Sequence, residues 1–124
     1  MTACSDVYYW EVAQSVDNIS KIEIVEFEDG VIPSVICEIA PENYDELIND
    51  VQTMPARKYI GSLASISRRI IKISFLDETY DIISLYEPRH ITEPDYGISY
   101  SKITWLYFNS KDFEQLINKW IEKS

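Results

Sequence analysis

The stretch RIIKISFLDETYDIISLY, residues 69–86, sets the fold class, because it predicts two strands joined by a tight turn. Ile71, Ile73 and Phe75 occupy alternate positions, and this spacing places side chains on one face of a strand. Polar residues 77–79 supply the turn. The predicted strands are Arg69–Leu76 and Tyr80–Tyr86. The chain is therefore expected to contain an antiparallel sheet.

A second hairpin is predicted earlier in the chain, from two apolar runs on either side of Glu28-Asp29-Gly30. The apolar pattern of Ile19–Glu28 changes face in mid-run, which predicts a β-bulge or two half-buried faces. Val31–Ile39 is almost continuously apolar, which favours a central, well-buried strand.

Three further segments have strand character, and one has loop character. Val7–Ala13 is rich in aromatic and β-branched residues, although it also fits a helix capped by Asp6. Arg57–Ala64 is ambiguous between a short strand and a loop, whereas Ile103–Phe108 predicts a strand. Glu87–Ser101 has two prolines, a glycine and few aliphatic residues, so it is the longest expected loop.

Two helices are predicted from apolar residues at helical spacing. One follows Pro41 and ends before Pro55. The other begins after a cap at Asn109 or Ser110 and runs to about Lys123. Their apolar stripes are Tyr44, Leu47, Ile48 and Val51 in the first helix and Phe113, Leu116, Ile117, Trp120 and Ile121 in the second. Both stripes are interpreted as core packing.

These elements predict one α+β domain over residues 1–124, with a mainly antiparallel sheet of five to six strands and two helices packed on one face. The length of 124 residues and the hydrophobic fraction of 46% suit one core without disulfide or metal support. No apolar run is long enough for a membrane helix, and the N-terminal residues do not resemble a signal peptide. We therefore expect a cytoplasmic protein that does not bind membranes.

No complete catalytic, metal or cofactor motif is present, so we expect no enzyme, no metal and no cofactor. His90, the single histidine, is expected to be a solvent-facing loop residue. A nucleophile pair of Cys37 and His90 is disfavoured, because Cys37 lies in a buried-looking run. An alternative is a small-molecule site in which the Glu87–Ser101 loop closes over His90 and Tyr96.

The charge distribution carries the functional hypothesis. The net charge is −10; residues 1–50 hold twelve acidic residues and one basic residue, whereas residues 51–124 hold nine acidic and ten basic residues. Such a balance disfavours direct binding to nucleic acid or to an anionic membrane and favours a basic protein partner. The basic stretch Arg57, Lys58, Arg68, Arg69 and Lys72 is interpreted as a solvated strand face.

We expect the partner to bind an acidic surface made of Glu28, Asp29, Glu42, Asp45, Glu46 and Asp50. Tyr8, Tyr9, Trp10 and Tyr44 are candidate aromatic anchors beside it. In size and charge the chain resembles bacterial immunity proteins, which neutralise basic nuclease toxins, and phage-encoded DNA mimics. The hypothesis is an immunity-type inhibitor of a nuclease toxin. The alternatives are a DNA-mimic inhibitor of a nucleic-acid-processing enzyme and a structural or adaptor domain of a larger or homodimeric assembly. A purely solubilising role of the charge also remains open.

Overall fold

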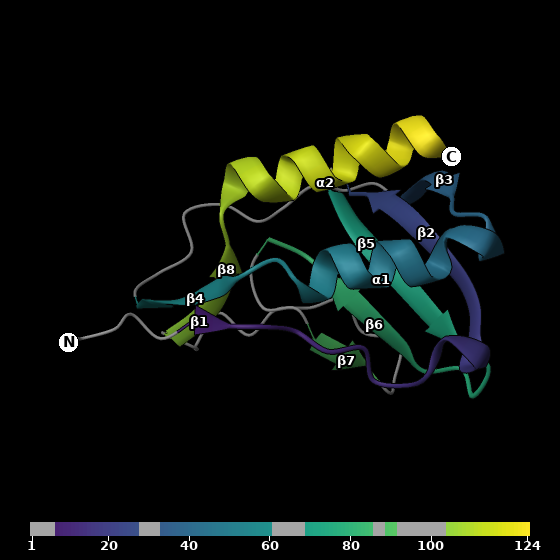
Figure 1. Cartoon of the computed structure of the whole chain (residues 1–124), viewed down its shortest axis with the longest axis horizontal. Helices are drawn as coiled ribbons and strands as arrows, with labels where there is room; N and C mark the ends of the chain where they lie inside the picture. Colours follow the sequence, from purple (N-terminus) through teal and green to yellow (C-terminus); the bar gives the residue numbers. More distant parts are fainter. Residues whose placement is uncertain (1–6, 28–32, 61–68, 86–88, 92–103) are drawn as a thin grey trace.

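The computed structural model describes residues 7–27, 33–60, 69–85, 89–91 and 104–124. Within these ranges the chain forms eight strands and two α-helices, an α+β fold (Figure 1). The strands are β1 (Val7–Tyr8), β2 (Ile19–Glu26), β3 (Ser34–Glu38), β4 (Ala56–Ile60), β5 (Arg69–Phe75), β6 (Tyr80–Ile83), β7 (Arg89–Ile91) and β8 (Thr104–Phe108). The helices are α1 (Tyr44–Gln52) and α2 (Ser110–Lys123), and 3₁₀ turns η1 (Val16–Asn18) and η2 (Pro41–Asn43) precede β2 and α1.

The strands divide between two antiparallel sheets, so the prediction of one sheet with five to six strands was wrong. The larger sheet has the order β3-β2-β5-β6-β7, and the smaller sheet has the order β1-β4-β8. Figure 1 shows the smaller sheet beside the end of the large sheet at which α2 begins. Strand order depends on contacts between distant segments, and residue alternation within each strand does not specify it.

Alternation within the central strands creates two differently covered faces. In β5, Ile71 and Ile73 are fully buried on the face that packs against both helices. Ile70 points to the opposite face and joins a smaller apolar cluster with Val25 and Ile82. The main core therefore lies between the large sheet and the two helices, which occupy the same side of it (Figure 1).

β3 is an edge strand, which corrects the prediction of a central, buried strand for Val31–Ile39. It pairs with β2 alone, and the side chain of Val35 is 54% exposed. The predicted β2–β3 pairing is confirmed, with a register shift at Ile24/Val25 where the apolar pattern changes face. Ile39, just after this strand, is buried against the core, but the strand itself is not buried on both faces. The continuous apolar run therefore indicated contact with the core at one end of the strand only.

The small sheet connects to the main core through the end of β8. Phe108 is fully buried, and its backbone N–H donates to the carbonyl of Leu85 at 3.0 Å. Its ring stacks on Phe113 in the first turns of α2, with ring centroids 6.0 Å apart. Asn109 then caps α2, because its side-chain oxygen accepts from the backbone N–H groups of Lys111 and Asp112. The predicted cap and apolar stripe of this helix are confirmed.

Two predicted segments differ from the structure. The strand predicted over Val7–Ala13 is reduced to the two residues of β1, and the rest of the segment is irregular. The expected Glu87–Ser101 loop contains β7, which forms the edge of the large sheet beside β6. Residues 87, 88 and 92–101 of that loop lie outside the described residues.

Candidate functional site

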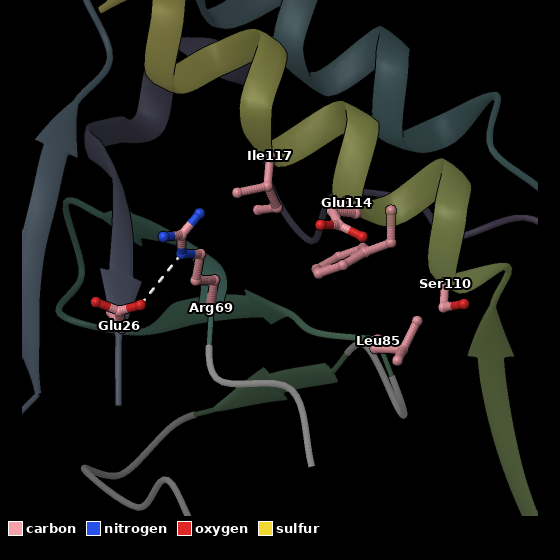
Figure 2. A pocket seen from close by; sticks show the side chains of 7 residues that line it. Glu26, Arg69, Leu85, Ser110, Glu114 and Ile117 are labelled. Carbon is pink, nitrogen blue, oxygen red and sulfur yellow. Dashed lines mark hydrogen bonds and ion pairs between the residues drawn. The ribbon is translucent and has the colours of Figure 1, made fainter. Parts of the chain in front are cut away.

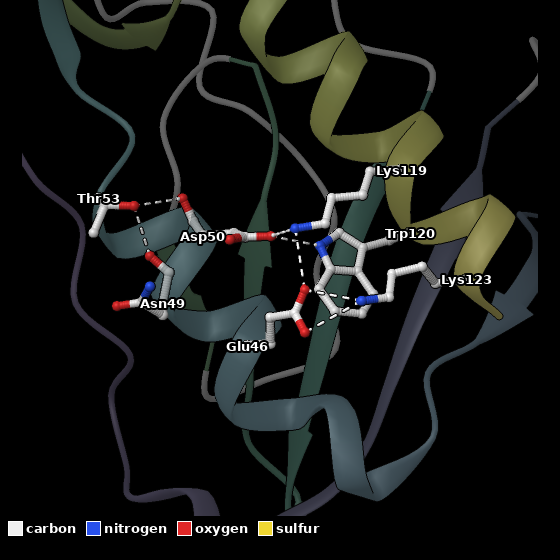
Figure 3. A network of polar contacts seen from close by, with 7 residues as sticks. All are labelled: Glu46, Asn49, Asp50, Thr53, Lys119, Trp120 and Lys123. Carbon is white, nitrogen blue, oxygen red and sulfur yellow. Dashed lines mark hydrogen bonds and ion pairs between the residues drawn. The ribbon is translucent and has the colours of Figure 1, made fainter.

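The predicted acidic surface on α1 is divided by the packing of α2. Glu46 accepts from Lys123 Nζ at 3.0 and 3.2 Å and lies 3.2 Å from Lys119 Nζ (Figure 3). Asp50 binds the same Lys119 at 2.7 Å. Hydrogen bonds from Lys123 and then Lys119 lower the pKa of Glu46 below its ordinary value. These two carboxylates are therefore partly neutralised within the molecule.

Trp120 lies on the core side of this network and forms a hydrogen bond with one of its carboxylates. The indole is fully buried, and its Nε1 donates to Oδ2 of Asp50 at 3.1 Å. Lys119 and Lys123 place their ammonium groups 5.2 and 5.0 Å from the centre of the Trp120 ring, within the range of cation–π attraction. The main role of Glu46 and Asp50 in the structure is thus to join α1 to α2.

Glu42 and Asp45 remain available for a partner. Both are exposed, Glu42 in η2 and Asp45 in the first turn of α1, and no described residue forms an ion pair with either of them. Glu38, at the end of β3, is also exposed and close enough for its charge to raise the pKa of Tyr44, after the larger effect of burial. We call Glu38, Glu42 and Asp45 the acidic corner.

The six predicted partner-binding residues thus fall into three groups. Glu42 and Asp45 belong to the acidic corner, and Glu46 and Asp50 bind α2. Glu28 and Asp29 lie outside the described residues. Sequence reasoning missed Glu38, whose signal was a charged residue near the end of an apolar run, three positions before Pro41.

The aromatic anchors are mostly unavailable. Tyr44 is buried in the main core, so its assignment as an anchor was wrong. Tyr8 and Trp10 are half-buried and pack against that core. Only Tyr9, at 59% exposed, presents a large aromatic surface among these four residues.

Asp81 and His90 form a close polar pair on neighbouring strands of the large sheet. The two residues are register partners in β6 and β7, and Nδ1 of His90 lies 2.6 Å from Oδ1 of Asp81. The other carboxylate oxygen accepts from the backbone N–H of Ala13 at 3.0 Å. Asp81 has no exposed surface, whereas the His90 side chain is 34% exposed. The expectation of a loop residue at position 90 was therefore wrong, because His90 lies in a strand and binds Asp81, although its side chain is partly exposed to solvent as expected.

The environment of this pair is charged as well as buried. Burial raises the pKa of Asp81 above its ordinary value, while the Ala13 N–H and the His90 ring act in the opposite direction. Phe75 lies against the imidazole with ring centroids 5.9 Å apart. Nearby, Asp77 accepts hydrogen bonds from Thr79 and from Gln14. The bonds from Thr79, and to a smaller extent the bond from Gln14, lower the pKa of the Asp77 carboxyl.

A pocket of about 470 Å³ lies where α2 passes over the ends of β2, β5 and β6 (Figure 2). Its apolar lining is Leu85, Phe113 and Ile117, and its polar lining is Glu26, Arg69, Ser110 and Glu114. Glu26 and Arg69 are register partners on β2 and β5, and they form an ion pair of 3.2 Å at one end of the pocket. A pocket of this size and lining suits a small molecule with an apolar body, and no local pattern in the sequence indicates it.

The basic stretch is divided between the two sheets. Arg57 and Lys58 lie on β4, whereas Arg69 and Lys72 lie on β5 of the large sheet. The Lys72 ammonium lies 4.7 Å from the centre of the Tyr80 ring. Arg68 lies outside the described residues. The described part of the stretch therefore does not form one continuous patch on a single sheet.

The described residues contain neither the Cys37–His90 pair nor a metal-binding cluster. Cys37 lies on β3 and His90 on β7, which are opposite edges of the large sheet, so the two do not form a pair. No group of three or more metal-binding side chains occurs in this part of the chain. None of its helices has the length and apolar character needed to cross a membrane.

Comparison of the chain with protein-family models, with curated proteins and with solved structures gave no match.

Proposed function

We propose that the protein binds and neutralises a basic protein, and that this partner is a nuclease toxin inhibited in the manner of an immunity protein. The main support for this proposal is that Glu42 and Asp45 are exposed at one corner of the fold and form no ion pair with any described residue. Glu38 extends this corner onto β3. Concentrated negative charge steers a basic partner and accelerates its encounter.

The acidic corner works by occlusion in this proposal, without catalysis. A nuclease holds its substrate through cationic groups that contact phosphates. Carboxylates placed over those groups would block the substrate sterically and pair with the same charges. Tyr9 and Val35 are exposed and offer apolar surface for packing against the partner.

The test uses two matched variants with equal changes in charge. One is the triple variant Glu38→Gln, Glu42→Gln, Asp45→Asn. The control is Glu78→Gln, Glu114→Gln, Glu122→Gln, which neutralises three exposed residues outside the acidic corner. Each is used with the wild type to capture proteins from host lysate at low and moderate salt. We expect a basic protein to be retained by the wild type and the control and lost by the corner variant.

The captured protein is then assayed directly. We expect it to have nuclease activity that the wild type inhibits at equimolar ratio, with an association rate that falls as salt rises. Equal retention by both variants would remove the acidic corner from the mechanism. A captured nucleic-acid-processing enzyme of another kind would favour the DNA-mimic alternative. A complex insensitive to salt would favour the adaptor alternative.

A further inference from the structure

The Asp81–His90 pair holds a carboxylate where burial opposes its charge. Asp81 is fully buried, yet both of its oxygens are engaged, one by Ala13 and one by His90. A side chain that only filled space at this position would not need an ionisable group, because an apolar residue avoids the cost of desolvation. Buried carboxylates next to a partly exposed histidine are typical of sites at which protons move.

The hydrogen bond determines which ring nitrogen is free. Imidazole is normally a stronger base than a carboxylate, so the proton shared by the two groups lies on Nδ1. The neutral ring then carries its lone pair on Nε2. Nδ1 faces a carboxylate with no exposed surface, whereas the His90 side chain as a whole is 34% exposed. No described residue hydrogen-bonds to Nε2.

From this geometry we infer that Asp81 and His90 form a general-base site, independent of the acidic corner. Nε2 of His90 removes a carbon-bound proton from a small neutral or cationic molecule, and the electron pair of the broken C–H bond forms a double bond within that molecule as a leaving group departs. Asp81 is a positioning residue, since it orients the ring and stabilises the imidazolium that forms. The imidazolium then releases its proton to water, which restores the site.

The charges around the pair set the class of substrate. Asp77 is exposed nearby; hydrogen bonds from Thr79 are the main cause of its lowered pKa, and a protonated His90 ring would add to this effect. Asp81 adds a second carboxylate, and the chain carries a net charge of −10. Anionic molecules such as phosphates are repelled from such a site, whereas neutral and cationic molecules are admitted.

The first test reads the tautomer of the ring. His90 is the single histidine of the chain, so its ring nitrogens give unambiguous signals in nitrogen NMR of the full chain. In the neutral ring, we expect a proton on Nδ1 and none on Nε2. In Asp81→Asn, the Asn side chain can still accept from Ala13 and can donate to Nδ1. The proton should therefore move to Nε2. A wild-type ring protonated on Nε2 overturns the inference.

The second test measures proton removal with nitrobenzisoxazole as the probe. The base takes the carbon-bound proton of the probe, the released electron pair forms a nitrile, and the N–O bond breaks to give a phenolate. We expect the rate of probe cleavage by the wild type to be at least about tenfold higher than the rate with an equal concentration of N-acetylhistidine. General-base catalysis on a natural substrate typically contributes a rate enhancement of about a hundredfold or more. Asp81→Asn and His90→Gln should both fall to the rate of the buffer. A wild-type rate equal to that of N-acetylhistidine, or an undiminished rate in folded Asp81→Asn, refutes the inference.

Discussion

The indole Nε1 of Trp120 donates a hydrogen bond to Oδ2 of Asp50 across the interface between the two helices (Figure 3). Trp120 is the largest fully buried side chain among the described residues, and this bond satisfies its polar group. A buried donor that loses its acceptor keeps its desolvation cost without compensation. Asp50 is therefore a structural residue in addition to a member of the predicted acidic surface.

Asp50→Ala should lower the free energy of unfolding by about 1–3 kcal/mol, because the Trp120 N–H would be left without an acceptor. Asp50→Asn keeps an acceptor oxygen and should cost less. Urea denaturation followed by tryptophan fluorescence measures both changes. The control is Asp45→Ala, an exposed change on the same helix, expected within about 0.5 kcal/mol of the wild type. Equal losses at both positions would contradict the role assigned to the Trp120–Asp50 bond.

Asn109→Ala should destabilise the protein by about 1 kcal/mol, because the N–H groups of Lys111 and Asp112 lose their acceptor. Asn109→Asp retains a side-chain oxygen at the cap and should be close to the wild type. Thermal and urea unfolding give the comparison. Equal stability of the alanine and aspartate variants would show that the side-chain oxygen at position 109 does not stabilise the helix.

Local signals explain what could be predicted from the sequence. Each of these signals lies within a short segment of the chain. Examples are the Asn109 cap and apolar stripe of α2, the alternation of β5 and the proline before α1. Such features depend on neighbours in the chain, so propensity and periodicity detect them.

Long-range contacts explain what could not be predicted. Lys123 reaches Glu46 across 77 positions of sequence, and no local pattern relates the two. The sequence therefore predicted that every carboxylate of α1 was available to a partner, although Glu46 and Asp50 bind α2. His90 was assigned to a loop because of the prolines on either side of it, and its short strand became visible only through pairing with β6.

Glu46→Gln should make the stability of the protein less sensitive to acid. Lys123 and Lys119 lower the pKa of Glu46, and a carboxyl with a depressed pKa stabilises the fold above its unfolded pKa. That stabilisation is lost as the pH falls through the folded pKa. Urea midpoints measured between about pH 7 and pH 3 should therefore fall less steeply in the variant. In about 1 M salt the two profiles should converge, because the exposed ion pairs are screened. Parallel profiles at low salt would contradict the assignment.

Asp81→Asn should show the opposite dependence on pH. Burial raises the pKa of Asp81, so its contribution to stability is fully present below the unfolded pKa and is lost as the pH rises through the folded pKa. The asparagine carries no charge and escapes that loss. The stability of Asp81→Asn relative to the wild type should thus increase from about pH 3 to neutral pH in urea denaturation. Asp81→Ala, which leaves Ala13 and His90 without their partner, should be less stable than Asp81→Asn at neutral pH. A relative stability that falls with rising pH would mean that the ionised carboxylate stabilises the fold, and Asp81 would then be a structural salt-bridge residue.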